Sequence, residues 1–223
     1  MNDRFWQPGG NPNLLPESSW NEEAGLDWSL SGSSAIRRLD LGVTVYNMLI
    51  NNMIQWVPLT SNVWSPQNIQ QVWSRGVESY CKASANAEKK GGYLKVSYAY
   101  SPSTYSSSGG SGDNSKGKQL IYIPLHKLNA VLGMNSGKYF GLLNSTLNGE
   151  SFVQQDNGKS LPVVLLINLT LGREMVMKTF SSRFQIEIRN LLNAHYQVVQ
   201  YYPEPGVSVM LNVTLIIHKN KKK

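Results

Sequence analysis

Residues 65–80 have the sequence SPQNIQQVWSRGVESY, and this stretch decides the expected fold. Ser65 is a favourable N-cap, and Pro66 stands at the first helical position, where its missing N–H costs nothing. From Ile69 onward, apolar side chains recur at i, i+3, i+4, i+8 and i+11, which is the spacing of one helical face. The pattern predicts an amphipathic helix over residues 66–88 that packs on the core.

Outward from this helix, most of the chain alternates in the manner of strands. A second helix is predicted over 181–195, where Phe184 and Ile188 recur at helical spacing after a serine cap. Residues 196–202 and 207–217 flank a Pro-Glu-Pro-Gly turn and predict a hairpin. The sequence therefore predicts an α+β fold: a twisted, mainly antiparallel β-sheet with two principal packed helices, an extended N-terminal arm and a C-terminal β-hairpin.

The composition predicts three parts of the chain. Residues 1–34 are rich in proline, glycine and serine and are expected to form an extended or disordered arm. Residues 35–218 are expected to form a single globular domain with a flexible loop at 101–118. Residues 219–223 form a basic tail.

The arm carries large apolar side chains that a solvated tail rarely holds. Aromatic residues often anchor interfaces, so these side chains are candidates for self-association. The alternative is that they pack on their own domain. The set comprises Trp6, Leu14, Leu15, Trp20 and Trp28.

The formal net charge is +7 and the pI about 9.4, a balance that favours an anionic partner, either nucleic acid or an acidic membrane surface. Each lysine alone is equally compatible with a solvated surface. Their positions at a predicted helix end, in a loop and at a terminus favour contact with an anionic membrane or a ribonucleoprotein. The lysines concerned are Lys89, Lys90, Lys116, Lys118, Lys219, Lys221, Lys222 and Lys223.

Catalytic chemistry is not indicated. The three histidines lie far apart in the sequence, and none has a carboxylate at the spacing of a dyad or a metal site. Cys81 is the one cysteine, which excludes an internal disulfide framework and fits a reducing compartment. We therefore expect a protein that is not an enzyme and that has no metal and no cofactor.

No secretion or membrane-crossing signal is expected either. Residues 1–10 are polar and lack the apolar stretch of a signal peptide. The longest apolar run, 161–171, is too short to span a bilayer as a helix. Three Asn-x-Ser/Thr triplets occur, but two lie inside expected strands, so we interpret them as chance matches. The expected protein is not secreted and has no transmembrane segment.

The order of elements resembles the matrix proteins of rhabdoviruses and related negative-strand RNA viruses. The likeness covers about residues 39–217 and rests on the Trp-bearing helix of 69–80, the basic-glycine turn and aromatic strand of 89–93, and the loop of 103–118. The chain then ends with a strand, a helix and a terminal hairpin.

This resemblance implies a structural role in virion assembly. The protein would self-associate, bind an anionic membrane surface and condense the viral nucleocapsid. Its partners would be other copies of itself, the nucleocapsid or RNA, a peripheral anionic membrane and a viral glycoprotein tail. Its location would be the virion and the host cytoplasm or inner membrane face.

Two other classes remain open at this point. A small viral coat protein with a jelly-roll fold, binding RNA, would explain the many short strands and the basic balance. A secreted, lectin-like β-rich domain would explain the sequons. Helix content, glycosylation and partner would separate these alternatives.

Overall fold

The computed structural model describes residues 3–32, 36–60, 63–87, 90–106 and 114–218. Within these ranges every regular element is a strand, and fourteen strands follow one another along the chain. Their bounds are β1 Ser18–Ser31, β2 Arg38–Thr60, β3 Val63–Ala87, β4 Lys90–Tyr100, β5 Ser103–Tyr105, β6 His126–Ser136, β7 Tyr139–Asn148, β8 Ser151–Phe152, β9 Ser160–Leu161, β10 Val164–Val176, β11 Phe180–Arg189, β12 Gln197–Val199, β13 Tyr202–Pro203 and β14 Ser208–Ile217.

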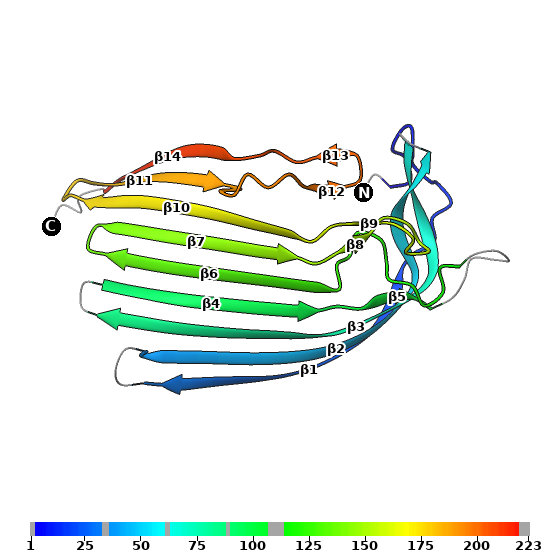
Figure 1. Cartoon of the computed structure of the whole chain (residues 1–223), viewed down its shortest axis with the longest axis horizontal. Coiled ribbons are helices and arrows are strands. Elements are labelled where there is room, and N and C mark those ends of the chain that lie inside the picture. The colour runs from blue at the N-terminus through cyan, green and yellow to red at the C-terminus, as the bar shows by residue number, and fades with distance from the viewer. Residues whose placement is uncertain (1–2, 33–35, 61–62, 88–89, 107–113, 219–223) are drawn as a thin grey trace.

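Nine of these strands form one long antiparallel meander. Their order is β1-β2-β3-β4-β6-β7-β10-β11-β14, and the short β5 pairs with β3. Figure 1 shows the nine strands running side by side. The pairs β8–β9 and β12–β13 form separate two-stranded sheets within the connections. Such an up-and-down arrangement is the wall structure of β-barrels.

The connections alternate between short and long along the meander. Short connections join β1 to β2, β3 to β4, β6 to β7 and β10 to β11, and we call their side of the sheet the turn end. Long connections of residues 101–125, 149–163 and 190–207 lie at the opposite side, the loop end. At the loop end β2 and β3 also extend beyond the other strands as one long hairpin.

The predicted α+β fold is wrong, because both principal helices are strands. Residues 66–88 fall almost entirely in β3, which pairs with β2 and with β4, and residues 181–189 lie in β11. Val72 and Trp73 lie on opposite faces of β3, and Val77 shares the face of Trp73. Apolar residues on both faces of one strand thus imitate the spacing of a helix, and pairing with the two neighbouring strands decides the outcome.

The predicted C-terminal hairpin is also wrong. β14 pairs with β11 along its whole length, from Ser208 opposite Arg189 to Ile217 opposite Phe180. The segment expected to pair with it instead forms β12, which turns back onto β13. The chain around residues 203–206 therefore ends a small local hairpin and leads back into the main sheet.

The segment 1–34, predicted as an extended arm, contributes a complete strand. Ser18–Ser31 pairs residue for residue with β2, from Ser18 opposite Asn51 to Ser31 opposite Arg38. Residues ahead of β1 lie over the β2–β3 hairpin, where the Asn68 side chain bonds both backbone groups of Leu15.

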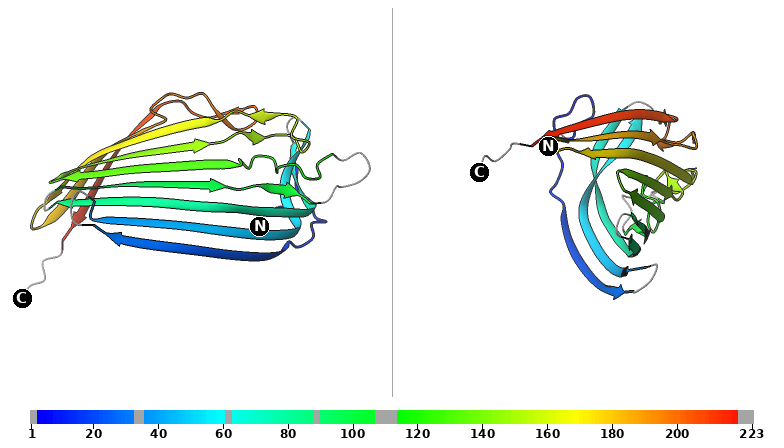
Figure 2. Two further views of the ribbon diagram at one scale, coloured as in Figure 1. Left: turned by 60° about the horizontal axis from the view of Figure 1, so that its bottom comes forward. Right: turned by 90° about the vertical axis from the view of Figure 1, so that its left-hand side faces the viewer.

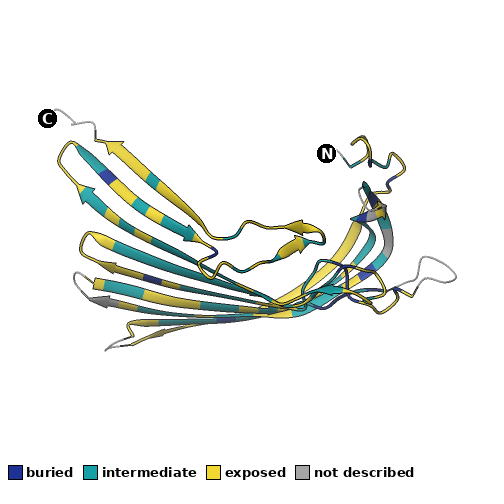
Figure 3. Ribbon diagram, turned by 45° about the horizontal axis from the view of Figure 1, so that its top comes forward, coloured by how far each residue is buried: buried dark blue, intermediate teal, exposed yellow. Residues whose placement is uncertain are grey.

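A cluster of buried apolar side chains lies at the loop end. Figure 3 shows that the long strands are mostly exposed or half-buried. Asn52, with a φ of 55°, interrupts the alternation of β2, so Ile50 and Met53 both pack on the same cluster. The cluster consists of Val72, Tyr105 and Leu120, with Ile50, Met53 and Ile123 packed against it.

Candidate functional site

The register divides the sheet into two chemically different faces. Residues directly opposite one another in antiparallel strands share a face. One row of such residues crosses all nine strands of the meander, and all but one of its members are leucine, isoleucine or valine. The row is Leu30, Leu39, Ala83, Leu94, Leu132, Leu143, Leu169, Ile188 and Val209. We call the face that bears this row the outer belt.

The opposite face is polar, and we call it the inner wall. A row displaced by one residue from the first crosses seven strands and contains a single apolar member. This row is Ser29, Asp40, Lys82, Lys95, Val131, Asn144 and Asn168. One apolar and one polar row, displaced by a single residue, are typical of a wall between lipid and water.

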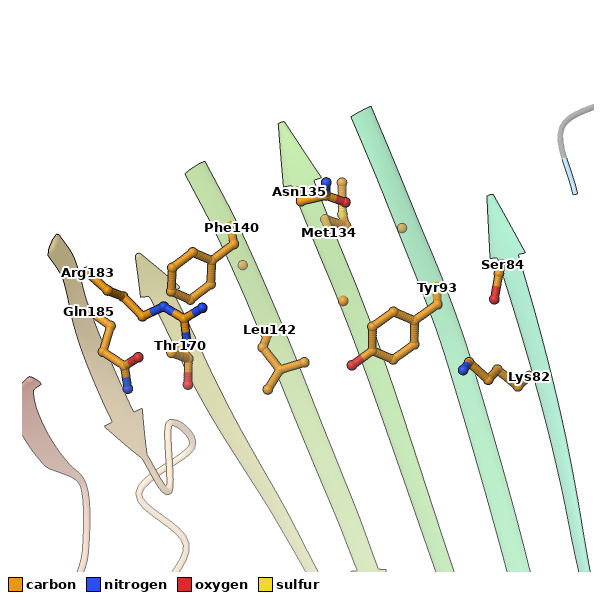
Figure 4. A pocket seen from close by; sticks show the side chains of 13 residues that line it. Lys82, Ser84, Tyr93, Met134, Asn135, Phe140, Leu142, Thr170, Arg183 and Gln185 are labelled. Carbon is orange, nitrogen blue, oxygen red and sulfur yellow. The ribbon is translucent and has the colours of Figure 1, made fainter. Parts of the chain in front are cut away.

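The inner wall lies on the concave side of the sheet. A cavity of about 610 Å³ crosses the strands from β3 to β11. Figure 4 shows Lys82, Tyr93, Leu142, Thr170 and Arg183 around it, all of which belong to the inner-wall face. A hollow that spans this many strands of one sheet marks its concave side, and Figure 2 shows the corresponding curvature.

The outer belt has the height of a membrane core. On β14 it runs from Val209, which is 69% exposed, to Ile217, which is 82% exposed. These residues span about 27 Å along the strand at about 3.4 Å per residue. With a strand tilt of about 40°, that corresponds to about 21 Å along a membrane normal, close to the apolar band of about 25 Å in membrane barrels. So much exposed apolar surface is typical of a lipid contact.

Aromatic residues border the outer belt at both ends. Toward the loop end, the Tyr98 hydroxyl lies 2.7 Å from Nδ1 of His126, whose ring centroid is 5.2 Å from that of Tyr100. Toward the turn end, the Arg173 guanidinium lies over the Tyr139 ring, 5.4 Å from its centroid. Aromatic girdles at the two interfaces are a feature of membrane barrels.

Hydrogen bonds and ion pairs connect the strands of the inner wall. Asp40 accepts from Nε of Arg38 at 2.8 Å and from the Ser29 hydroxyl at 2.7 Å. Asp27 accepts from the Tyr80 hydroxyl at 2.7 Å. Near the turn end, Arg183 and Glu174 form an ion pair between β11 and β10. These contacts satisfy polar groups on the concave face without an apolar core.

Four aromatic rings of the inner wall lie over glycines of a neighbouring strand. In each case the two residues are directly opposite in the register, and a Cβ on the glycine would collide with the ring or its hydroxyl. Glycines covered by aromatic side chains allow a sheet to bend while keeping its register. The pairs are Tyr46–Gly76, Tyr80–Gly42, Tyr93–Gly133 and Phe140–Gly172.

Hydrogen bonds join the connections at the loop end to one another. The Asn157 side chain accepts from the backbone N–H of Gln119 and donates to its carbonyl, both at 2.8 Å. Gln119 is itself buried and donates to the carbonyls of Ser101 and Ile123. Burial raises the pKa of Tyr122 in the same connection, which favours its neutral form.

A second cavity of about 580 Å³ lies between these connections and the β2–β3 hairpin. Its floor is apolar, with Val57, Ile121 and Val153, and side-chain amides such as those of Gln67 and Asn114 line the rest. A pocket of this size with an apolar floor and several polar groups fits a small ligand.

The proposed self-association residues are spread over two regions. Trp20 and Trp28 lie on β1, 71% and 50% exposed, and share the outer-belt face. Leu14 is buried at the loop end, whereas Trp6 and Leu15 are exposed there. Self-association through these residues stays a prediction.

The proposed anion-contact lysines do not form one patch. Lys90 lies at the turn end, in the first position of β4, and Lys116 and Lys118 are exposed in the connection at the loop end. Lys89, Lys219, Lys221, Lys222 and Lys223 lie outside the described residues. The described lysines are thus at opposite ends of the sheet, and their contact with an anionic membrane or ribonucleoprotein stays a prediction.

Sequence reasoning missed both the outer belt and the inner-wall residues. Each strand carries only a short alternation, and the signal becomes clear when nine strands are aligned by their register. Leu39, Leu41, Val43 and Val45 show this alternation within β2. The repetition of this alternation in the later strands was the signal from which the two faces could have been predicted.

The residues that the structure describes were also searched for a metal site and for a membrane-spanning helix. Their His, Cys, Asp and Glu side chains form no group of three or more that could hold a metal ion. They contain no helix that is long and apolar enough to cross a membrane.

Comparison with known proteins gives a consistent result. The model of the family described as TonB dependent receptor-like, beta-barrel matches residues 1–191. The vitamin B12 transporter BtuB of Photobacterium profundum is 38% identical over 82 residues, and that of Vibrio vulnificus is 33% identical over 79 residues. Each alignment covers 35% of this chain and 12% of the relative.

Solved structures show the same fold. The ferric preacinetobactin receptor BauA from Acinetobacter baumannii matches with a TM-score of 0.65 and 18% identity, over 96% of this chain and 32% of that one. The ferric yersiniabactin uptake receptor FyuA from Yersinia pestis matches with a TM-score of 0.60 and 15% identity, over 91% and 30%. The chain thus spans about a third of these receptors.

These matches overturn the viral interpretation. The resemblance to a rhabdovirus matrix protein is wrong, and so are the expected nucleocapsid, RNA and glycoprotein partners. The expected location in the virion and the host cytoplasm or inner membrane face is wrong as well. The alternative of a jelly-roll coat protein is not supported either. The matched family consists of outer-membrane receptors and transporters, so the expectation that the chain is not an enzyme is confirmed.

Proposed function

Because the chain belongs to the TonB-dependent receptor-like β-barrel family, we propose that it forms a sector of the wall of a bacterial outer-membrane receptor. The receptor would take up a ligand of the kind named for its relatives, vitamin B12 or a ferric siderophore. TonB would be its partner for energy coupling.

The single observation that carries this proposal is the two-faced sheet. Nine antiparallel strands present leucine, isoleucine and valine on the convex side and amides, hydroxyls and ions on the concave side. Only helices and closed barrels satisfy every backbone group inside a bilayer. In the proposed receptor, the free edges of β1 and β14 therefore pair with further strands of the wall.

The connections give the wall its orientation. Bacterial outer-membrane barrels have short turns on the periplasmic side and longer loops outside. The turn end would accordingly face the periplasm and the loop end the exterior. The cavity of about 580 Å³ at the loop end would then be where a ligand from outside first meets the chain.

The test is ligand capture at the surface of cells. Cells that lack their own receptors for cyanocobalamin and ferric enterobactin are made to produce the whole receptor whose wall would contain this chain, and are given each ligand in radiolabelled form. We expect one ligand to bind, to be displaced by excess unlabelled ligand, and to enter the cell only when TonB is present.

Two matched variants test whether the loop-end cavity is where the ligand is captured. Val153 lies 4% exposed on the cavity floor, so Val153→Asp places a charge there, whereas Leu142→Asp places one on the inner wall away from the loop end. Capture lost in Val153→Asp and kept in Leu142→Asp supports the proposal. Surface-exposed protein that captures neither ligand contradicts it.

A further inference from the structure

We propose that the outer belt has a binding site for the headgroup of an anionic phospholipid at its turn end, around Arg173. This residue lies on β10, directly opposite Tyr139 of β7 on one side and Phe184 of β11 on the other. Its side chain leaves the sheet on the same face as that of Leu171, which is 53% exposed on the outer belt. The inference rests on the proposed function in one respect, that the outer belt contacts lipid.

Arg173 lies level with the turn between β6 and β7. Tyr139, its partner in the register, is the first residue of β7, and the backbone N–H of Glu174 donates to the carbonyl of Lys138 in that turn at 2.8 Å. The outer-belt residues that precede Arg173 on β10, up to Leu171, are all apolar. A cation that follows an apolar run at the height of a turn lies where hydrocarbon meets lipid headgroups, and its long stem lets the charge reach them.

The Arg173 guanidinium has no ion pair with a carboxylate among the residues that the structure describes. Its carbon atom Cζ lies 5.4 Å from the centroid of the Tyr139 ring. Glu174 is the next residue, but its side chain leaves the other face of the sheet and pairs there with Arg183. The ring positions the guanidinium but supplies no full negative charge, so the cation can bind an anion.

Further cations lie at the same end of the sheet. Lys138 is exposed in the turn between β6 and β7, and Lys178 is exposed in the turn between β10 and β11. Figure 1 shows both turns at the turn end. The register row through Arg173 also reaches Lys90, across β7 and β6. On the outer-belt face of the described meander strands the one carboxylate is that of Glu22, toward the loop end of β1, so the turn end of this face is positive.

The face and the end of the sheet identify the anion. Because Arg173 continues the apolar row of the outer belt, the molecules that reach it are lipids of the surrounding bilayer. The turn end would face the periplasm, so the headgroups there belong to the phospholipids of the periplasmic leaflet. A guanidinium binds phosphate oxygens through charge-assisted, bidentate hydrogen bonds, and nearby lysines add attraction to a leaflet with negative charge.

The experiment identifies the lipid beside Arg173 in the whole receptor whose wall would contain this chain. The receptor is placed in nanodiscs that contain phosphatidylglycerol and phosphatidylcholine in a known ratio. Phe184, which is 40% exposed and opposite Arg173, is replaced with photoreactive benzoylphenylalanine, and the lipid crosslinked there is identified by mass spectrometry. The same photoreactive group at Leu165, which is 40% exposed on β10 and further from the turn end, gives the reference ratio of the two lipids.

We expect phosphatidylglycerol to be enriched roughly fivefold at position 184 relative to position 165, and the enrichment to fall as salt rises. Arg173→Gln should remove most of the enrichment, whereas Arg173→Lys, which keeps the charge, should retain most of it. Lys138→Gln and Lys178→Gln should each remove part of it. Lys127→Gln is the matched control, because it removes one positive charge from the inner wall, and it should leave the enrichment unchanged.

Crosslinking at position 165 shows in each variant that the outer belt is in the bilayer. The same lipid ratio at positions 184 and 165 overturns the headgroup site and leaves the proposed wall function intact, because lipid still reaches both positions. Equal loss of enrichment in Arg173→Gln and Lys127→Gln means a diffuse charge effect and also overturns the site. Absence of crosslinked lipid at both positions contradicts the wall function and the headgroup site together.

Discussion

Gly133 and Tyr93 show how single residues shape the inner wall. The Tyr93 ring occupies the space above the glycine of the neighbouring strand, so a Cβ at position 133 would lie 2.3 Å from Cε1 of the ring. The ring also lies beside the Lys82 ammonium. One aromatic side chain therefore covers the glycine of the neighbouring strand and lies beside a charge.

We predict that Gly133→Ala lowers the free energy of unfolding by about 1–3 kcal/mol, because the ring must leave its position. Gly141→Ala is the matched control, since its Cβ would meet its nearest heavy atom at 3.4 Å, an ordinary contact. Urea unfolding in lipid vesicles measures both. A double-mutant cycle that combines Gly133→Ala with Tyr93→Ala should show that the effects of the two substitutions on the free energy of unfolding are not additive. Equal stability of the two glycine variants would contradict this account.

Ile167 and Leu166 are neighbours in β10 that lie on opposite faces. We predict that Ile167→Arg, on the outer belt, destabilises the protein in a bilayer by about 2–4 kcal/mol. Leu166→Arg, on the inner wall opposite Thr146, should change stability by less than about 1 kcal/mol. The measurement is unfolding in vesicles. A larger effect at Leu166 would reverse the assignment of the two faces.

At the scale of elements, the connections at the loop end depend on Asn157. Its φ of 60° suits glycine, so Asn157→Gly removes the side-chain bonds to Gln119 without backbone strain. We predict faster hydrogen exchange at the Gln119 amide, by an amount equivalent to about 1–3 kcal/mol of local stability. Gln155→Gly, at an exposed position nearby, is the control and should leave that amide protected.

β3 shows what the sequence could and could not predict at this scale. Alternation predicted strands over residues 39–50 and 93–100, which lie in β2 and β4, and the apolar run of 161–171 predicted a strand that lies mostly in β10. In β3 the Ser65–Pro66 pair and the apolar residues of both faces favoured a helix, yet its pairing with β2 extends from Val63 to Ser84. That pairing joins residues distant in sequence, and local propensity carries no information about it.

At β11 the error has another cause: Phe184 and Ile188 lie on the outer belt four residues apart, a spacing that also fits one face of a helix. Residues 207–217 were expected to form a strand, and the error there concerns the partner, because β14 pairs with β11 and not with residues 196–202. The sequence also indicated basic character and no catalytic set. It did not predict the inner wall, because Lys82 and Lys95 become neighbours only through the register of β3 and β4.

For the whole molecule, the central claim is that one sheet separates lipid from water. Its convex outer belt would contact the hydrocarbon core, and its concave inner wall would border an aqueous interior. Both faces occur in the same strands, so neighbouring residues should experience different surroundings. The native cysteine, Cys81, is exposed on the outer belt opposite Leu41 and Val96, which makes it a direct probe.

The most direct test is the reactivity of thiols toward a water-soluble maleimide in lipid vesicles. The native chain is compared with the double variant Cys81→Ser, Ser97→Cys, whose thiol lies on the inner wall opposite Tyr80 and Asn129. The account predicts that the inner-wall thiol reacts rapidly and that Cys81 reacts only after detergent removes the lipid. Equal reaction of Cys81 in intact vesicles would contradict the assignment of the outer belt to the membrane.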